Sequence, residues 1–222
     1  MNNYKYKEQS GRSMIEMLGV LAIIGVLSVG GIAGYSKAMN KFKTNKVADN
    51  VSMIVANIKT LYAQQNTYTD LSNKNAISMG VIPDELGTNA KTGTLTNAFN
   101  GPVFVGEVDT TSTSKDQRGF YILFNGLSRE GCITLATNDW GSGYSSGLIA
   151  LKVSGAPIAD TETNARTAAV DAKMAIGCQG SSTDFIACPG GSGLAVPMKV
   201  TTAASACSCN AGNTCSILWK YY

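Results

Sequence analysis

The chain has 222 residues, a formal net charge of +3 and no histidine. This length suits one anchor and one domain of ordinary size. The missing histidine removes the commonest general base and the commonest zinc ligand, and no basic block is long enough to suggest a nucleic-acid groove. We therefore expect no enzyme activity, no catalytic residue, no metal site, no cofactor and no direct nucleic-acid site.

A long apolar run near the N-terminus contains a single carboxylate. From Met14 to Gly34 every residue is apolar, small or hydroxylic except Glu16. The run has the roughly 20 residues that a membrane-spanning helix needs, and the positive flank before it, which includes Arg12, favours a cytoplasmic N-terminus. A carboxylate inside hydrocarbon costs about 2.5–3.5 kcal/mol on insertion scales. Glu16 therefore predicts a compensating partner.

Two plainer interpretations of this run fit less well. A secretory signal peptide has an apolar region of roughly 7–15 residues with a small-residue cleavage site after it. Here the run is longer, and the cleavage-like glycine, Gly11, precedes it. A simple one-pass anchor has the right length but leaves Glu16 unexplained.

Gly11, the five residues that end in Glu16 and the unbroken apolar helix together resemble the class III leader of type IV pilins and pseudopilins. The resemblance implies a leader of residues 1–11, removed by a prepilin peptidase, and a mature chain that begins at Arg12 with Glu16 as its fifth residue. It also implies that the new α-amino group of one subunit neutralises Glu16 of its neighbour, which agrees with the high cost of an unpaired buried charge. The sequence departs from the family at Arg12, where members often begin with Phe, Met or Leu, and this departure bears on methylation of the new amino group.

The helix is expected to continue well beyond the apolar run. From Tyr35 to Tyr62 apolar residues recur with the i, i+3, i+4, i+7 spacing of an amphipathic helix, and no proline occurs between residues 12 and 82. We predict one helix over residues 12–66, with a membrane and filament-core half, 12–34, and an amphipathic half, 35–66. The frequent glycines of the first half predict close helix packing, with local loosening of the helix as the alternative.

Residues 67–222 are predicted to form a globular head. The segment Tyr68–Leu86 resembles the post-spine region of type IVb pilins of the conjugative thin-pilus kind, and Asn97–Val103 resembles the same family's entry into its first strand. The resemblance implies an α+β pilin fold, in which the long helical spine packs on an antiparallel sheet and a disulfide-bounded region ends the chain.

Several elements of the head are predicted from its residue pattern. A short helix is expected over Leu71–Met79, and an alanine-rich helix over Asp160–Ile176, capped by Asp160 or Thr161, is expected to lie on the sheet. The side chains of Tyr62, Tyr68, Trp140 and Trp219 are expected in the core. Strands are predicted at Val103–Val108, Gly119–Asn125, Cys132–Thr137, Gly147–Val153 and Ser216–Tyr221.

Six cysteines lie beyond the apolar run, at positions Cys132, Cys178, Cys188, Cys207, Cys209 and Cys215. An even number in an exported domain predicts disulfides, and the sequence alone does not choose their connectivity. The segments around Cys207 and Trp219 resemble the family's terminal disulfide and last strand, which implies a Cys132–Cys207 bond. The simplest scheme then pairs Cys178 with Cys188 and Cys209 with Cys215. The stretch from Cys178 to Met198 is expected to be an exposed insertion.

The string Gly143-Tyr-Ser145-Ser-Gly147 matches the nucleophile elbow of serine hydrolases. A serine nucleophile needs a base to accept its proton, and the chain has no histidine for Ser145. We therefore expect no catalytic role for this segment.

The resemblance as a whole implies a structural subunit, most simply the major pilin, of a type IVb pilus. Its expected partners are the prepilin peptidase, the inner-membrane pilus assembly machinery and further copies of itself. Before assembly it is expected in the bacterial inner membrane as a single-pass protein, and afterwards in the extracellular pilus. The alternatives are a minor pilin or a type II secretion pseudopilin and, more remotely, a membrane-anchored extracytoplasmic binding protein or enzyme.

Overall fold

The computed structural model describes residues 14–110, 115–141, 146–171, 185–188, 194–209, 212 and 214–222. The chain divides into two units, Met1–Met39 and Asn40–Tyr222. Helix α1, Met14–Leu61, begins in the first unit, and all the other described elements belong to the second. The second unit is the head, and it includes the last part of α1.

Within the head, α1 buries one stripe of side chains. The stripe consists of Thr44, Val47, Asn50, Val51, Ile54 and Ile58. The spacing is that of the predicted amphipathic helix, so residues three and four apart face the same side. The helix ends at Leu61, short of the predicted residue 66, because residues 63–67 contain no large apolar side chain that would continue the stripe. Tyr62 instead packs on Tyr68, with ring centroids 5.2 Å apart.

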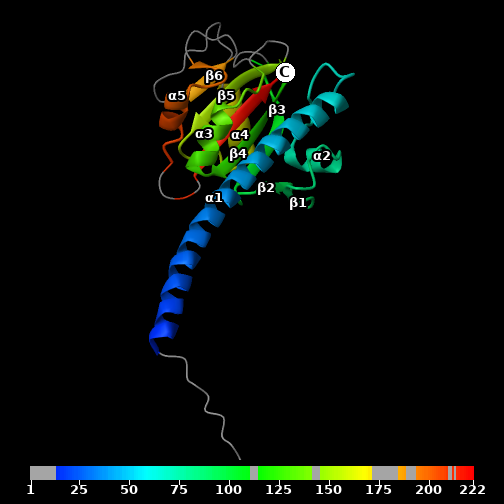
Figure 1. Cartoon of the computed structure of the whole chain (residues 1–222). Coiled ribbons are helices and arrows are strands. Elements are labelled where there is room, and N and C mark those ends of the chain that lie inside the picture. Colours follow the sequence, from blue (N-terminus) through cyan, green and yellow to red (C-terminus); the bar gives the residue numbers. More distant parts are fainter. Residues whose placement is uncertain are drawn as a thin grey trace, which may run out of the picture. The chain divides into compact units, whose positions relative to one another are not determined.

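The head is built on an eight-stranded sheet with the order β1-β2-β3-β4-β8-β5-β6-β7. Every neighbouring pair is antiparallel except β6 and β7, which are parallel. Figure 1 shows the last strand, β8, inserted between β4 and β5 near the middle of the sheet. The strands are β1 (Gly87–Asn89), β2 (Thr94–Thr96), β3 (Pro102–Val108), β4 (Gly119–Leu127), β5 (Leu148–Ser154), β6 (Phe185–Cys188), β7 (Leu194–Ala195) and β8 (Cys215–Tyr221).

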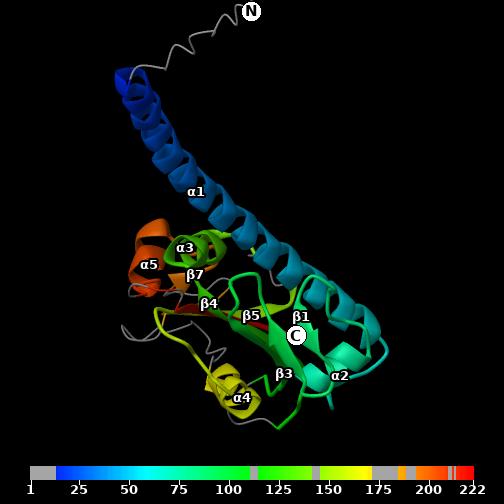
Figure 2. The ribbon, with the colours of Figure 1, turned by 90° about the horizontal axis from the view of Figure 1, so that it is seen from below.

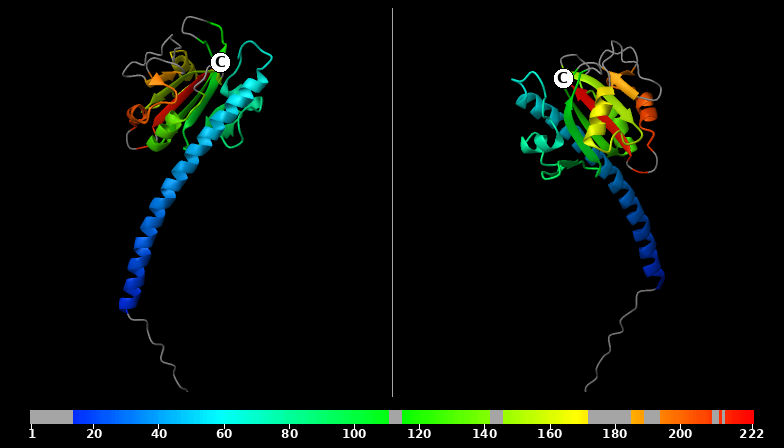
Figure 3. Two further views of the ribbon diagram at one scale, coloured as in Figure 1. Left: turned by 45° about the horizontal axis from the view of Figure 1, so that its top comes forward. Right: turned by 180° about the vertical axis from the view of Figure 1, so that it is seen from behind.

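Helices cover both faces of this sheet. The last part of α1 lies on one face with α3 (Arg129–Thr137) and α5 (Val200–Ala206), and α4 (Glu162–Asp171) lies on the other, as Figures 2 and 3 show. Alternate side chains of β4 therefore enter two different cores. Phe120 and Ile122 join the core under α1, whereas Tyr121 and Leu123 join the core under α4.

Most predicted elements of the head are confirmed. The short helix α2 spans Asn73–Ser78, and strands β3, β4, β5 and β8 match four of the five predicted strands. Trp219 is fully buried, Tyr62 is buried, and Tyr68 and Trp140 pack against the same core.

The alanine-rich helix also lies on the sheet as predicted. Ala165 and Ala169 of α4 are fully buried. The hydroxyl of Thr161 accepts a hydrogen bond from the backbone N–H of Asn164 at 3.2 Å, which makes Thr161 the capping residue. The predicted continuation of the helix beyond Asp171 lies outside the described residues.

The predicted strand at Cys132–Thr137 is wrong, because these residues belong to helix α3. The side-chain oxygen of Ser128 accepts a hydrogen bond from the backbone N–H of Gly131 at 3.1 Å and so caps the helix. Cys132, Leu135 and Ala136 are all fully buried, and their spacing of three and four residues is that of one helix face. Tertiary burial has outweighed the β-branched character of Ile133 and its neighbours.

The expectation of an exposed insertion from Cys178 to Met198 is met only in part where the structure describes it, since Ala195 and Pro197 are exposed. Strand β6 extends the sheet beside β5, and Val196 and Met198 are buried. Residues 172–184 and 189–193 of this region lie outside the described residues.

Gly101 closes a turn where no larger residue fits. The backbone N–H of Gly101 donates to the side-chain oxygen of Asn97, and the Asn97 amide donates to the backbone carbonyl of Asn125 at 2.8 Å. A Cβ atom at position 101 would collide with that same carbonyl of Asn125. The turn is therefore specific for glycine through close backbone approach.

We expect Gly101→Ala to destabilise the head by about 3 kcal/mol, because backbone must move to relieve the collision. Denaturant unfolding of the full chain in detergent, followed by tryptophan fluorescence, measures the change. Gly87→Ala is the matched control. Its new Cβ would lie 3.4 Å from the nearest atom, in ordinary contact, and we expect a change within about 0.5 kcal/mol. Equal effects of the two substitutions would contradict the assignment.

Candidate functional site

The first unit presents an apolar helix with one charge near its start. From Met14 to Lys37 every described residue of α1 is exposed in the isolated chain, including large side chains such as Leu18 and Ile23. Among the described residues, α1 is the one helix that is long and apolar enough to cross a membrane, judged by length and composition. Glu16 lies in its first turn.

Glu16 shares its helix face with a row of glycines. Gly19, Gly30, Gly31 and Gly34 follow Glu16 at spacings of 3, 14, 15 and 18 residues, which place all four within about 60° of Glu16 around a helix with 3.6 residues per turn. A Cβ atom at any of these four glycines, or at Gly25 on the opposite side, would find no other atom within 4 Å. These glycines therefore serve no packing inside the isolated chain, and they leave a shallow face on which another helix can approach closely.

The residues expected at the processing point, Gly11 and Arg12, lie outside the described residues. Their position relative to Glu16 is known from the sequence alone. The cleavage expectation remains a proposal.

Polar contacts fix the last part of α1 to the head. Lys46 forms an ion pair with Glu85 at 3.1 Å, and the Asn57 amide donates to the backbone carbonyl of Val81 at 3.0 Å. Near the end of the helix, the Lys59 ammonium donates to the backbone carbonyl of Ser146 at 2.6 Å. The head and this part of α1 are thus one packed body.

Lys59 also lies over an aromatic ring. Its ammonium is 5.3 Å from the centroid of Tyr221, a cation–π distance. Burial lowers the pKa of Lys59 from its usual value, since desolvation disfavours the charged form. The carbonyl of Ser146 and the Tyr221 ring replace part of the lost water.

Two disulfides join elements on the α1 side of the sheet. Cys132 of α3 is bonded to Cys207 at the end of α5, the bond that the resemblance implied. Cys209 is bonded to Cys215 at the start of β8, as in the simplest scheme. Cys178 and the side chain of Cys188 lie outside the described residues, so that pairing stays a prediction.

The same cysteines form the one cluster of metal-ligand type found among the described residues. The sulfur atoms of Cys132, Cys207 and Cys215 all lie within 4.8 Å of one another and are fully buried. All three sulfurs are committed to the two disulfides, and a disulfide sulfur is not the thiolate that binds metal. The residue pattern did not predict this closeness, because it arises only when α3, α5 and β8 pack together.

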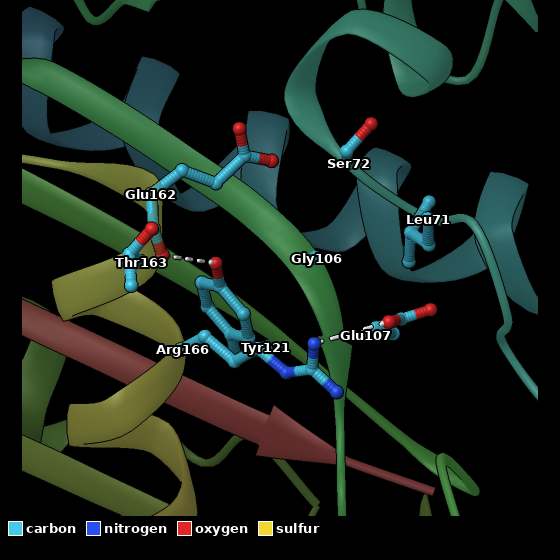
Figure 4. A pocket seen from close by; sticks show the side chains of 8 residues that line it. All are labelled: Leu71, Ser72, Gly106, Glu107, Tyr121, Glu162, Thr163 and Arg166. Atoms are coloured by element: carbon cyan, nitrogen blue, oxygen red, sulfur yellow. Dashed lines mark hydrogen bonds and ion pairs between the residues drawn. The ribbon is translucent and has the colours of Figure 1, made fainter.

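A polar pocket of about 290 Å³ lies on the α4 side of the head (Figure 4). The guanidinium of Arg166 forms an ion pair with Glu107 at 3.3 Å, and the Tyr121 hydroxyl donates to the backbone carbonyl of Glu162 at 3.3 Å. Burial raises the pKa of Tyr121 well above its usual value, which keeps the phenol protonated. No local residue pattern predicts this pocket, because its residues come from distant segments.

The carboxylates of this pocket hold the chain that follows α1. Glu107 accepts a hydrogen bond from the backbone N–H of Asp70 at 2.7 Å, and Glu162 accepts one from that of Asn73 at 2.8 Å. The pocket residues are thus engaged in joining β3, α4 and the loop before α2. The arrangement supports a structural role. Ser145 of the elbow-like string lies outside the described residues.

Comparisons with known proteins place this geometry in a family. The family profile described as PilS N terminal matches residues 41–220. The major structural subunit of the bundle-forming pilus of Escherichia coli O127:H6 is 29% identical over 142 residues, which cover 63% of this chain and 69% of that protein. The toxin coregulated pilin of Vibrio cholerae serotype O1 is 26% identical over 138 residues, covering 59% and 58% of the two chains.

A solved structure is also similar. The crystal structure of TcpA, a type IV pilin from the El Tor biotype of Vibrio cholerae, aligns with a TM-score of 0.48 and 14% identity, over 81% of this chain and 99% of that one. The family match itself covers most of the chain, from the last part of α1 to the end of β8. This chain therefore belongs to the PilS N-terminal family of type IV pilins.

Proposed function

We propose that this protein is a filament-forming subunit of a type IVb pilus, and specifically its major subunit. The observation that carries the proposal is the exposed apolar part of α1, in which Glu16 and four glycines occupy one face. A soluble protein rarely exposes so much contiguous apolar surface. Two relatives are named as the major structural subunit of a pilus and as a pilin, and the same role is proposed here.

The proposed assembly step moves α1 from lipid into a core of other α1 helices. Both environments are apolar, so the hydrophobic effect favours neither strongly, and close packing with polar pairing must decide. The glycine face lets neighbouring helices approach. Pairing of Glu16 with the α-amino group of a neighbouring mature chain removes the cost of a lone charge.

The head has a different part in the proposal. The head is the second unit of the chain and begins at Asn40, just beyond the apolar stretch. Its disulfides and ion pairs hold it together as one body. Such a body forms the outer surface of a filament whose core is helical. The proposed topology, with a cytoplasmic N-terminus before assembly, follows the positive flank of the apolar run.

Processing is the most direct test of the proposal. Cells that contain the prepilin peptidase are expected to yield a chain that begins at Arg12, because cleavage follows Gly11. Intact mass spectrometry of the membrane-extracted protein measures this, and the same protein from cells without the peptidase should begin at Met1. A Gly11→Leu substitution is the control, and it should leave the leader in place. An intact leader in peptidase-containing cells would overturn the pilin proposal for this chain.

Copy number separates the major subunit from its alternatives. A major pilin is expected to be the most abundant protein in filaments sheared from the cell surface. A trace amount there would instead favour a minor pilin, and its absence from surface filaments would favour a secretion pseudopilin.

A further inference from the structure

We propose that Cys209, Cys215, Cys207 and Cys132 form a thiol–disulfide relay, in which Cys209 exchanges with the disulfide of an external oxidoreductase and Cys215 exchanges with the buried Cys132–Cys207 pair. Two disulfides lie side by side in the head, joining Cys132 to Cys207 and Cys209 to Cys215. The sulfur of Cys215 lies within 4.8 Å of both sulfurs of the other bond. The inference concerns the head alone and does not depend on pilus assembly.

The distances suit exchange between the two bonds. Exchange requires a thiolate to reach a disulfide sulfur. A hop between staggered χ1 rotamers moves a cysteine sulfur by about 3 Å, which is comparable with the gap that separates 4.8 Å from a bonded pair. The sulfurs can therefore change partners through side-chain rotation within the folded head.

Access to the four sulfurs is unequal, and this sets the order of the relay. Cys132, Cys207 and Cys215 are fully buried, whereas Cys209 is half-buried and its neighbour Ser208 is exposed. An external sulfur reaches Cys209 first, since exchange depends on access to the sulfur that is attacked. The buried long-range bond is then reachable only through the local one.

The relay balances without net oxidation inside the chain. Starting from a Cys209–Cys215 bond and two thiols, the Cys207 thiolate attacks the Cys215 sulfur, which forms Cys207–Cys215 and releases Cys209 as thiolate. The Cys132 thiolate then attacks the Cys207 sulfur, which forms Cys132–Cys207 and releases Cys215 as thiolate. An external disulfide accepts the two electrons of Cys209 and Cys215 and re-forms their bond through a mixed disulfide at Cys209.

The entropic cost of loop closure suggests what the relay does during folding. Cys209 and Cys215 are 6 residues apart in sequence, whereas Cys132 and Cys207 are 75 apart. A short loop closes at lower entropic cost than a long one. The local bond therefore forms first and delivers its oxidising equivalent to the pair that only the packed head brings together.

A matched pair of variants of the full chain tests the relay. Cys209→Ser and Cys215→Ser remove the same disulfide and leave Cys132–Cys207 to hold the head, but they leave different free thiols. Each protein is incubated at pH 8.5, acid-quenched, alkylated after unfolding and mapped by peptide mass spectrometry. The relay predicts that the Cys209→Ser chain contains Cys207–Cys215 or Cys132–Cys215 bonds, at a level about tenfold or more above any exchange in the Cys215→Ser chain.

Three outcomes would contradict the relay. If the Cys209→Ser chain holds only the Cys132–Cys207 bond with Cys215 alkylated in every molecule, Cys215 does not exchange. Equal exchange in both variants would also contradict it, because Cys209 would then substitute for Cys215. Cys132→Ser gives a second readout, in which the relay predicts a Cys207–Cys215 bond with Cys209 alkylated, and a wholly retained Cys209–Cys215 bond speaks against it.

Discussion

Glu16→Ala is expected to abolish filaments while the chain still inserts into the membrane. Insertion becomes easier, since the substitution removes a charge that costs about 2.5–3.5 kcal/mol in a spanning helix. Assembly becomes harder, because the α-amino group of each neighbouring mature chain loses the partner that is proposed for it. Breaking a buried pair in this way costs about 3–5 kcal/mol, which corresponds to about two to four orders of magnitude in the association constant for each added subunit.

The measurement combines membrane fractionation with electron microscopy of surface filaments. Asp49→Asn is the matched control, because Asp49 is the other carboxylate of α1 and is exposed on the head part of the helix. The control should assemble normally. Filaments of normal number and length from the Glu16→Ala chain would show that the pairing assigned to Glu16 is wrong.

Periodic patterns made the spine and the central strands predictable. The buried positions of α1, such as Val47, Val51 and Ile54, repeat at helical spacing, and strands β3 and β4 are rich in β-branched and aromatic residues. The misassigned segment, Cys132–Thr137, contains β-branched residues in a short apolar run. These residues form helix α3 and not a strand because Ser128 caps the helix and one helix face is buried in the core.

The shortest strands and the long-range contacts of the head could not be predicted, for a different reason. Strands β1 and β2 have three residues each, too few to establish a period of two. The Glu107–Arg166 ion pair and the cluster of cysteine sulfurs each join segments that are far apart in the sequence. No local residue pattern therefore predicts them. The prediction of a role for Glu16 instead rests on local evidence, which is one carboxylate in an apolar run at a fixed distance after Gly11.

The glycine face of α1 lies between these cases. Local residue patterns predict close packing for all five glycines, and their spacing relative to Glu16 separates Gly25, on the opposite side of the helix, from the other four. All five have open surroundings in the isolated chain, and contacts of these glycines with neighbouring helices are part of the proposed assembly. A local loosening of the helix at Gly30 stays an alternative that the continuous helix α1 does not require.

The double substitution Cys132→Ala with Cys207→Ala is expected to be the most destabilising simple change in the head. Their disulfide closes a loop of 75 residues that spans β5, α4 and α5. In the chain-entropy account, removing such a bond costs about 4.5 kcal/mol, against about 2 kcal/mol for a bond that closes 6 residues. Both side chains are fully buried, so alanine also leaves small voids in the core.

Unfolding of the full chain in detergent, followed by tryptophan fluorescence, measures this difference, because Trp219 is buried and lies 5.1 Å from the ring of Trp140. We expect Tm to fall by about 10–15 °C, since each loss of about 1 kcal/mol in the free energy of unfolding lowers Tm by about 2–4 °C for a protein of this length. Cys209→Ala with Cys215→Ala is the matched control, and its Tm should fall by less than half as much. If the two double variants lose equal stability, the long loop is not the source of the stabilisation, and the head depends on packing around α3 and α5 instead.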